Sequence, residues 1–331
     1  VLPFAATMDP KHLQRFKNEA RAAASLHHEH IVPVHFVGNE RGVHFIAMQF
    51  IDGVTLAQVI RDLHHPEALP KPTDATGDWL PGNSSSTIAA AGLATEHGVR
   101  GKQSFQAAAR LIMQAAEALE YAHSMGVVHR DVKPGNLMID AAGRVWVADF
   151  GLAKVGTDVG MTMSGDLLGT LRYMSPEQAM ARHGLVDHRT DVYSLGATLY
   201  ELLTGQPVVR GDDKQEILRQ IAFEEPVTPR KVNSAIPVDL ETVLLKTLEK
   251  NPADRFGTAK ELADDLKRWL ENMPVRAKRP NVRQRLGKWV LRHPQMTATL
   301  LLLAVVCLAG VWAWDRQRGR AEGVANEVAV Q

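Results

Sequence analysis

The chain has 331 residues, and its 38 Lys and Arg nearly balance its 37 Asp and Glu. This balance creates no overall field that would favour nucleic acid, so we expect no nucleic-acid partner. The length allows one large domain or two ordinary ones. The single cysteine, Cys307, cannot form an internal disulfide.

The first sixty residues predict a small part that contains both helix and strands. Residues 8–26 predict a helix, with Asp9 as its N-cap and Pro10 at the first helical position. Residues 32–38 and 42–50 predict two strands, joined by the turn residues between them. A short helical stretch is expected at 54–63.

Residues 64–103 differ in composition, because Pro, Gly, Ser, Thr and Asn dominate and the apolar periodicity fades. This pattern predicts a long, largely disordered surface insertion. Ser104 then has the character of a cap for a helix over 105–126. The predicted buried side of that helix consists of Leu111, Ala115, Ala118, Leu119 and Ala122.

Two aspartates stand in the stretch HRDVKPGNLMIDAAGRVWVADFG, residues 129–151. Residues 136–140 and 144–149 predict two strands joined by a turn at 141–143. Asp131 precedes this hairpin and Asp149 ends it, so we expect the two carboxylates to return close together. Two neighbouring acids are costly unless a cation or a proton relieves their repulsion.

The residues around the two aspartates indicate how that repulsion is relieved. A divalent metal held by Asp149 and a substrate proton near Asp131 would satisfy both carboxylates. Asn136 adds a neutral oxygen ligand, and Lys133 adds a mobile cation. Oxygen ligands for Mg²⁺, a base and a cation are the groups that phosphoryl transfer from a nucleotide requires.

The rest of the chain predicts helices and then a membrane anchor. Residues 188–205, 213–223, 238–250 and 258–270 have helical periodicity. Seven Lys or Arg and no acid lie between 276 and 292, and no charged residue lies between 294 and 314. Twenty-one residues form about 31 Å of helix, enough to cross a bilayer. The alternative is a buried core helix, which rarely has basic residues at one end and Trp at both.

The ordered motifs HRDVKPGN, DFG, GTLRYMSPE, DVYSLG and NPADRF resemble those of bacterial transmembrane eukaryotic-type Ser/Thr protein kinases. The resemblance covers residues 1–272. It implies an α+β, two-lobed protein-kinase-like fold, with an incomplete small β lobe and a large, mainly helical lobe. We expect a basic juxtamembrane segment at 273–293, one transmembrane helix at 294–314 and the start of an extracytoplasmic region at 315–331. By the positive-inside rule, residues 1–293 would lie in the cytoplasm of a single-pass cell-membrane protein.

The resemblance also implies roles for individual residues. The catalytic group would comprise Asp131, Lys133 and Thr170. Asn136 and Asp149 would hold Mg²⁺, and Lys133 would also contact the transferring phosphate of ATP. The other residues implied at the ATP site are Glu19 on the first helix, the gatekeeper Met48, the backbones of Gln49 and Ile51, and Met138 under the base.

Regulatory and structural residues follow from the same resemblance. Arg130 would bind a phosphorylated activation segment, in which Thr162 and Ser164 resemble an autophosphorylated pair. A homodimer would allow that phosphorylation in trans, and the other partners would be protein substrates with Ser or Thr and the lipid bilayer. Glu177 and Arg255 would form an ion pair in the large lobe, and Asp191 would brace the catalytic loop.

One part of the kinase pattern is missing from the sequence. No Gly-rich strand pair and no third-strand lysine precede Glu19, and residues 1–3 resemble those that directly follow that lysine. We therefore expect a truncated enzyme that transfers phosphate poorly as it stands. The alternative is a non-catalytic kinase-like scaffold or interaction module at the membrane.

The stretch HHEH at 27–30 allows two interpretations. Three His and Glu29 are good metal ligands, but adjacent residues seldom converge on one ion. The stretch also resembles the loop after the small-lobe helix of kinases.

Overall fold

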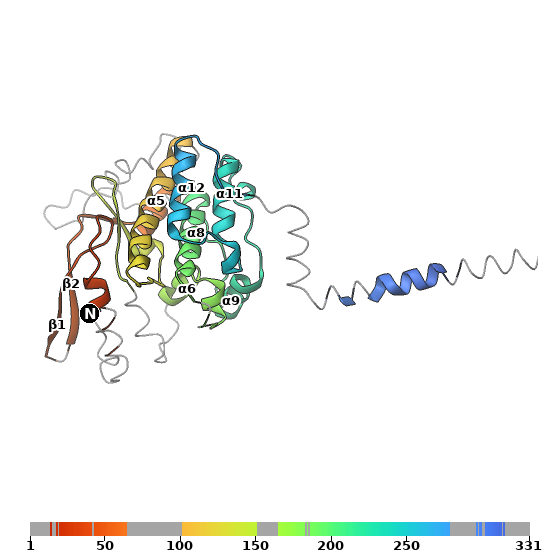
Figure 1. Cartoon of the computed structure of the whole chain (residues 1–331), viewed down its shortest axis with the longest axis horizontal. Coiled ribbons are helices and arrows are strands. Elements are labelled where there is room, and N and C mark those ends of the chain that lie inside the picture. The colour runs from red at the N-terminus through yellow and green to blue at the C-terminus, as the bar shows by residue number, and fades with distance from the viewer. Residues whose placement is uncertain are drawn as a thin grey trace, which may run out of the picture. The chain divides into compact units, whose positions relative to one another are not determined.

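The structure of the chain is a computed structural model (Figure 1) that describes residues 14, 18, 20–41, 43–64, 101–150, 165–182, 184, 186–278, 296, 298–299, 302–312 and 314. The chain divides into two compact units, Val1–Lys278 and Arg279–Gln331. Residues 65–100, which form most of the predicted insertion, lie outside the described residues.

The first described elements confirm the predicted small part. Residues 14, 18 and 20–24 are helical, within the predicted helix 8–26, and residues 1–13 lie outside the described residues. Strands β1 (Val34–Glu40) and β2 (Val43–Met48) pair antiparallel, and the register from Val34↔Met48 to Glu40↔Val43 contains one irregularity near Val34. The two predicted strands therefore form a hairpin.

A second sheet has the order β3–β4–β5, built from Gly53–Thr55, Leu137–Asp140 and Val145–Val147. The predicted β4–β5 hairpin is confirmed, but the sequence analysis missed β3. A Cβ at Gly53 would lie 2.1 Å from the carbonyl oxygen of Ile139, so glycine allows β3 to approach β4. The predicted helix start at Val54 is wrong, because Val54 belongs to β3 and helix α3 spans Leu56–His64.

Helix α5 (Lys102–Ser124) begins earlier than expected. Ser104 does not cap it, because the Ser104 hydroxyl donates to the Gly101 carbonyl at 2.8 Å from inside the first turn. All five positions predicted for the buried side are buried. The register of the helix was therefore predicted correctly, whereas its first residue was not.

The large lobe is helical, as predicted. Its elements are the short η3 (Pro134–Asn136), α6 (Gly165–Leu171), α7 (Pro176–Ala179), α8 (Arg189–Thr204), α9 (Lys214–Phe223), α10 (Pro229–Val232), α11 (Val238–Thr247), η6 (Pro252–Asp254) and α12 (Ala259–Leu270). Asp213 and Thr258 cap α9 and α12 by accepting backbone N–H groups at 2.8 and 3.1 Å. Gly205 ends α8 in the left-handed region, with φ 72°.

Four helices form the core of the large lobe (Figure 1). Helix α5 packs against α8 and α12, and α11 packs against both α8 and α12. Gly196 permits the close contact of α8 with the end of α11, because a Cβ there would lie 2.3 Å from Oγ1 of Thr247. Residues 125–133 connect α5 to η3 and the β4–β5 hairpin, and Asp191 of α8 accepts the backbone N–H groups of His129 and Arg130 in this connection.

The chain continues along α12 after the helix ends. Asp265 is 1% exposed, and its carboxylate accepts the backbone N–H groups of Arg276 and Ala277 at 2.8 and 2.7 Å. Arg268 also donates from Nε to the Pro274 carbonyl at 2.7 Å. Residues 273–278, here named the C-terminal strap, belong to the first part of the predicted juxtamembrane segment and pack with the first unit.

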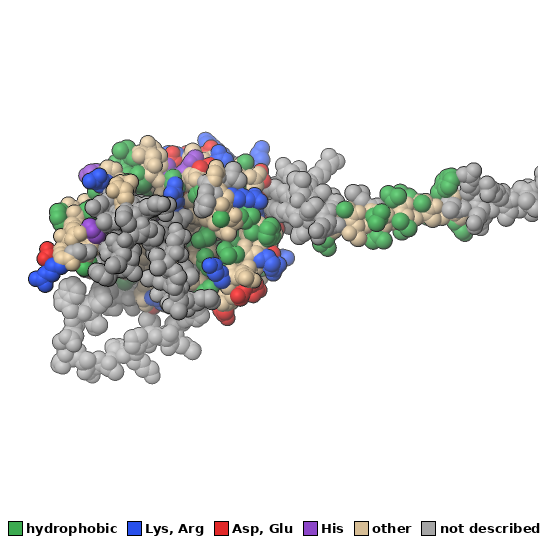
Figure 2. All heavy atoms as spheres, turned by 90° about the horizontal axis from the view of Figure 1, so that it is seen from below, with side chains coloured by type: hydrophobic (Ala, Val, Ile, Leu, Met, Phe, Trp, Pro, Cys, Tyr) green, Lys and Arg blue, Asp and Glu red, His purple; other side chains and the backbone are tan. Residues whose placement is uncertain are grey.

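The described residues of the second unit are helical at 296, 298–299, 302–312 and 314. Their large side chains, including Leu303, Val306 and Trp312, are exposed, and Figure 2 shows hydrophobic side chains along this helix. Among the described residues, no helix combines the length and hydropathy that crossing a membrane requires.

Candidate active site

Four of the predicted residues contact one another directly. The Lys133 ammonium lies 2.9 Å from Oδ2 of Asp131 and donates to Oγ1 of Thr170 at 3.0 Å. Asn136 donates from Nδ2 to the backbone carbonyl and to Oδ2 of Asp131, at 2.8 and 3.0 Å. The Asp131 carboxylate is thus held between a cation and an amide. The lysine is fixed in turn by a hydroxyl from α6.

A histidine connects the two aspartates. His129 accepts the Asp131 backbone N–H on Nδ1 at 3.2 Å, so its Nε2 carries the hydrogen and donates to the Ala148 carbonyl at 2.9 Å. Ala148 also donates its N–H to the Asn136 carbonyl at 2.9 Å. Asp149 follows with φ 58°, in the left-handed region that is uncommon for residues other than glycine. The loop before the hairpin and the segment that follows β5 are therefore fixed to each other.

Asp191, at the start of α8, braces this loop as expected. Its buried carboxylate accepts the backbone N–H groups of His129 and Arg130 at 2.8 and 2.7 Å. The same carboxylate contacts Nε2 of His123 at 2.8 Å. This third contact was not predicted. Three contacts to one buried acid compensate its desolvation and hold Arg130 in a left-handed conformation, with φ 64°.

The oxygen atoms near Asp131 suit a hard cation. Both hydrogen bonds of Asn136 Nδ2 go to Asp131, so the Asn136 side chain keeps its carbonyl oxygen as an acceptor. Among the described residues, the half-buried Asp149 carboxylate has neither a hydrogen bond nor an ion pair. One amide oxygen and one carboxylate are the donor set that Mg²⁺ binds when nucleotide phosphates and water complete its shell.

The predicted nucleotide side lies on neighbouring segments. Met48 ends β2, and Gln49 donates its backbone N–H to the Pro33 carbonyl at 2.9 Å. Ile51 is buried, and Met138 lies on β4 opposite Thr55. In the described part of the chain, none of these residues makes a hydrogen bond or an ion pair with Asp131. Glu19 lies outside the described residues.

The predicted regulatory residues are described only in part. Arg130 has an exposed side chain, and its backbone carbonyl accepts from Nε2 of Gln178 at 2.9 Å. Thr162 and Ser164 lie outside the described residues. Within the described part of the chain, the Arg130 guanidinium has no acidic partner.

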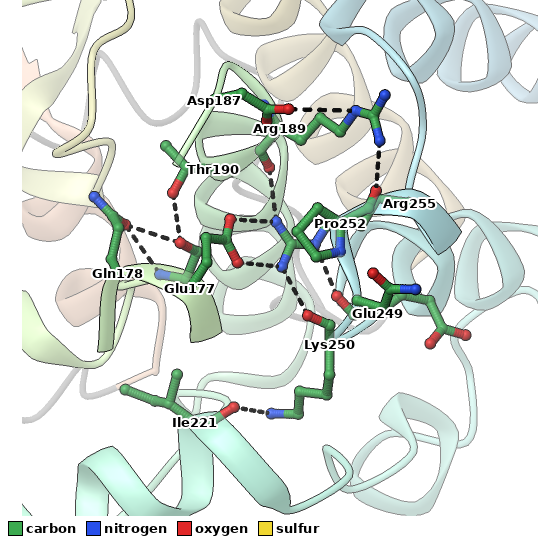
Figure 3. Close-up of polar contacts among 12 residues, drawn as sticks. Glu177, Gln178, Asp187, Arg189, Thr190, Ile221, Glu249, Lys250, Pro252 and Arg255 are labelled. Atoms are coloured by element: carbon green, nitrogen blue, oxygen red, sulfur yellow. Dashed lines mark hydrogen bonds and ion pairs between the residues drawn. The ribbon is translucent and has the colours of Figure 1, made fainter. Parts of the chain in front are cut away.

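The predicted ion pair of the large lobe is present (Figure 3). Arg255 donates from Nη1 and Nη2 to the two carboxylate oxygens of Glu177, both at 2.7 Å. Its remaining donors reach the backbone carbonyls of Glu249, Arg189 and Lys250 at 2.7, 3.0 and 3.1 Å. All five N–H groups of this guanidinium therefore have acceptors.

Sequence reasoning missed two polar contacts. Lys250 donates to the carbonyls of Gln220 and Ile221 at 3.2 and 2.7 Å, near the end of α9. Burial, and then the nearby Arg255, lower the pKa of Lys250 to about 8. The Tyr173 hydroxyl donates to Glu201, and burial raises the pKa of both groups. Nothing in the sequence signals either contact, because each joins segments far apart in the chain.

A two-lobed α+β fold that holds an Asp–Lys–Asn group against a hydroxyl fits a phosphotransferase domain. The protein kinase domain model matches residues 5–266. This chain therefore belongs to the protein kinase domain family.

Named relatives agree with this assignment. The chain is 37% identical over 274 residues to serine/threonine-protein kinase PknB of Mycobacterium leprae, covering 81% of this chain and 38% of that protein. It is 32% identical over 256 residues to the probable serine/threonine-protein kinase CPE1738 of Clostridium perfringens, covering 77% of this chain and 32% of that protein. The chain thus spans less than two fifths of the length of these relatives.

Solved structures share the fold. The crystal structure of the Mycobacterium tuberculosis PknI kinase domain aligns with a TM-score of 0.55 and 28% identity, covering 82% of this chain and 84% of that domain. A C20A mutant of the same domain aligns with a TM-score of 0.52 and 27% identity, covering 80% and 81%. The two-lobed fold expected from the motifs is therefore the fold of the first unit.

Proposed function

We propose that this chain is part of a membrane-anchored Ser/Thr protein kinase that transfers the γ-phosphoryl group of ATP to Ser or Thr of other proteins. The observation that carries the proposal is the contact of Lys133 with both Asp131 and Thr170, at 2.9 and 3.0 Å. These contacts support the assignment of a base, a cation and a hydroxyl that anchors the cation, which transfer to an incoming alcohol would use.

Each group has a role that its contacts support. Asp131 accepts or orients the proton of the substrate hydroxyl, and Asn136 holds the Asp131 carboxylate in place. Lys133 stabilises negative charge on the transferred phosphoryl group while Thr170 limits where its ammonium can move. Asn136 and Asp149 would hold Mg²⁺, which supplies charge neutralisation for the phosphates of ATP. Adenine would bind beside Met48, the Gln49 and Ile51 backbones and Met138.

The Ser/Thr preference rests on the lysine. Lys133 stands two residues after Asp131, and the Thr170 hydroxyl that receives its hydrogen bond lies in the segment GTLRYMSPE. The printed names of the relatives also specify serine/threonine kinases. We therefore assign alcohol side chains rather than tyrosine as the acceptors.

Regulation by phosphorylation is part of the proposal. Arg130 exposes its guanidinium next to the catalytic segment, and its backbone is held by Asp191. A phosphate on Thr162 or Ser164 would give this cation a partner and order the segment. Two copies of the chain would carry out this reaction in trans.

Anchoring rests on the second unit. Residues 294–314 have no charge, and the described helical positions among them expose apolar side chains on all sides. A helix that is hydrophobic all round suits lipid better than water. We place it in the cell membrane as a single pass, with the kinase domain on the cytoplasmic side.

The test uses the full-length protein in detergent or vesicles, with Mg²⁺, ATP labelled at the γ-phosphate and a generic protein acceptor. We expect label on Ser and Thr and none on Tyr after hydrolysis of the acceptor, and no transfer when EDTA removes the metal. A protein that binds partners but transfers no phosphate would instead support the non-catalytic scaffold.

A further inference from the structure

The loop 27–30, which the proposed reaction does not use, makes a specific contact with the catalytic hairpin. His30 is 8% exposed, and its Nδ1 lies 2.9 Å from the Val145 carbonyl oxygen. A carbonyl oxygen only accepts, so Nδ1 carries the hydrogen and donates it. Among the described residues no set of three or more His, Cys, Asp or Glu side chains converges on a metal position. The His30 ring also lies beside the His28 ring, and the His30 backbone N–H donates to Nδ1 of His28 at 3.1 Å.

His30 helps to complete the outer edge of β5. The other edge of β5 pairs with β4, in the register Ile139↔Val145 and Leu137↔Val147. On the outer edge, the Val147 N–H donates to the His30 carbonyl at 2.8 Å, and the Val147 carbonyl accepts from the Val32 N–H at 3.0 Å. The Val145 N–H donates to Oε1 of Gln114 at 3.0 Å, and the Val145 carbonyl accepts from the His30 ring.

Only two of these four outward bonds depend on side chains, those of His30 and Gln114. The strand has three residues, so the loss of one edge bond affects a large share of its hydrogen bonds. A buried carbonyl that loses its donor also retains the cost of desolvation. The His30 ring is therefore a major restraint on where β5 begins.

The restraint extends to the proposed metal ligand. After β5 ends at Val147, the chain passes through Ala148, whose carbonyl accepts from His129, to Asp149 in its left-handed conformation. Asp149 thus follows a strand that one histidine holds at its start and another holds just past its end. We propose that His30 is a positioning residue, whose ring hydrogen bond to the Val145 carbonyl places Asp149 for the metal–nucleotide complex. The role of Asp149 in this inference rests on the proposed function.

Three substitutions separate the hydrogen bond from the volume of the ring. His30→Leu fills the site but has no donor, and His30→Ala removes both. His30→Asn keeps a donor, because the amide nitrogen of Asn occupies nearly the position of Nδ1 in His. If the hydrogen bond positions Asp149, His30→Asn should keep the ordered β5 and the nucleotide affinity that His30→Leu loses.

The first readout needs no ligand. Hydrogen exchange of the full-length protein is followed at residues 145–149, with the β1–β2 hairpin as the internal reference. We expect His30→Leu to increase exchange at 145–149 about tenfold, with little change in β1–β2, and His30→Asn to stay near the wild type. Unchanged exchange in His30→Leu, or equal exchange in Leu and Asn, overturns the inference.

The second readout is binding of a non-hydrolysable ATP analogue, with Mg²⁺ and with EDTA. We expect His30→Leu to weaken the affinity measured with Mg²⁺ about tenfold and to leave the affinity measured in EDTA unchanged. We expect His30→Asn to have the wild-type affinity with Mg²⁺. Equal weakening with and without metal would mean a general structural defect and would overturn the positioning role. A wild-type protein that binds no nucleotide would refute the proposed function, while exchange at 145–149 would still decide whether His30 holds β5.

Discussion

The guanidinium of Arg255 and the carboxylate of Glu177 form a two-fold ion pair inside the large lobe, with 0% and 2% of their side chains exposed. Glu177 lies in α7 and is the last residue of the segment GTLRYMSPE that also carries Thr170, and Arg255 lies between η6 and α12. The pair thus fastens the end of the activation segment to the C-terminal helices (Figure 3).

Breaking this pair should be costly. Arg255→Met leaves the Glu177 carboxylate buried without its cation and also removes donors from three backbone carbonyls. We expect a loss of about 3–5 kcal/mol in the free energy of unfolding, measured by urea denaturation.

The matched control is an exposed ion pair in α12, Lys260 with Asp264. Lys260→Met should cost less than about 1 kcal/mol because water screens that pair. A loss for Arg255→Met no larger than that of Lys260→Met would contradict the importance of the buried pair.

The packing around Gly196 leaves no room for the methyl group of an alanine side chain. Its Cβ would meet Oγ1 of Thr247 at 2.3 Å and the Thr247 Cβ at 2.8 Å, so α8 and α11 would have to separate. We expect Gly196→Ala to destabilise the fold by about 1–3 kcal/mol. Gly184→Ala is the control, because nothing lies within 4 Å of its added Cβ. Equal thermal midpoints for the two variants would refute this packing argument.

Lys250 predicts a specific pH dependence of stability. Burial lowers its pKa to about 8 in the fold, below its ordinary value of 10.5. Between these values the unfolded chain binds more protons than the folded chain, so the free energy of unfolding rises as pH increases from 8 towards 10. The full effect is on the order of 3 kcal/mol, and Lys250→Met should abolish this rise.

The comparison is made by denaturation of wild type and Lys250→Met at several pH values from 7 to 10. Above pH 10 the buried Tyr193, whose pKa burial raises, contributes the opposite slope, so the range ends there. Parallel pH profiles for the two proteins would show that Lys250 does not carry the effect.

Asp265 should determine whether the C-terminal strap stays on α12. Asp265→Ala removes the acceptor of the Arg276 and Ala277 amides, and we expect faster hydrogen exchange at both, with a stability loss of about 1–3 kcal/mol. Asp264→Ala, on the exposed side of the same helix, should leave both amides protected. Protection that persists in Asp265→Ala would mean that other contacts hold the strap.

The contacts among Asp131, Lys133, Asn136 and Thr170 could be anticipated, because three of these residues lie within six positions and a recognisable segment supplies the fourth. The β4–β5 hairpin was also predictable, since its strands flank a short turn. Strand β3 was not, because Gly53–Thr55 is too short to show alternation and directly precedes a helix.

Long-range polar contacts were the least predictable. Asp265 lies on an amphipathic helix rich in acids and bases, and nothing in the sequence distinguishes it from the exposed Asp264 beside it. Its burial depends on the strap folding back onto α12, which is a property of the three-dimensional packing. The His30 contact with Val145 is similar, because 115 positions separate the two residues.

The central claim is that Asp131 is the catalytic base of a phosphoryl-transfer site. The most direct test is the rate of phosphate transfer from ATP to a Ser/Thr protein acceptor by full-length wild type and Asp131→Asn, with thermal unfolding of both proteins as the folding control. Asn keeps the size of Asp131 but cannot take a proton, so the rate should fall by about 10²–10⁴ while the unfolding midpoint changes little. A variant that folds normally and transfers phosphate at the wild-type rate would contradict the claim.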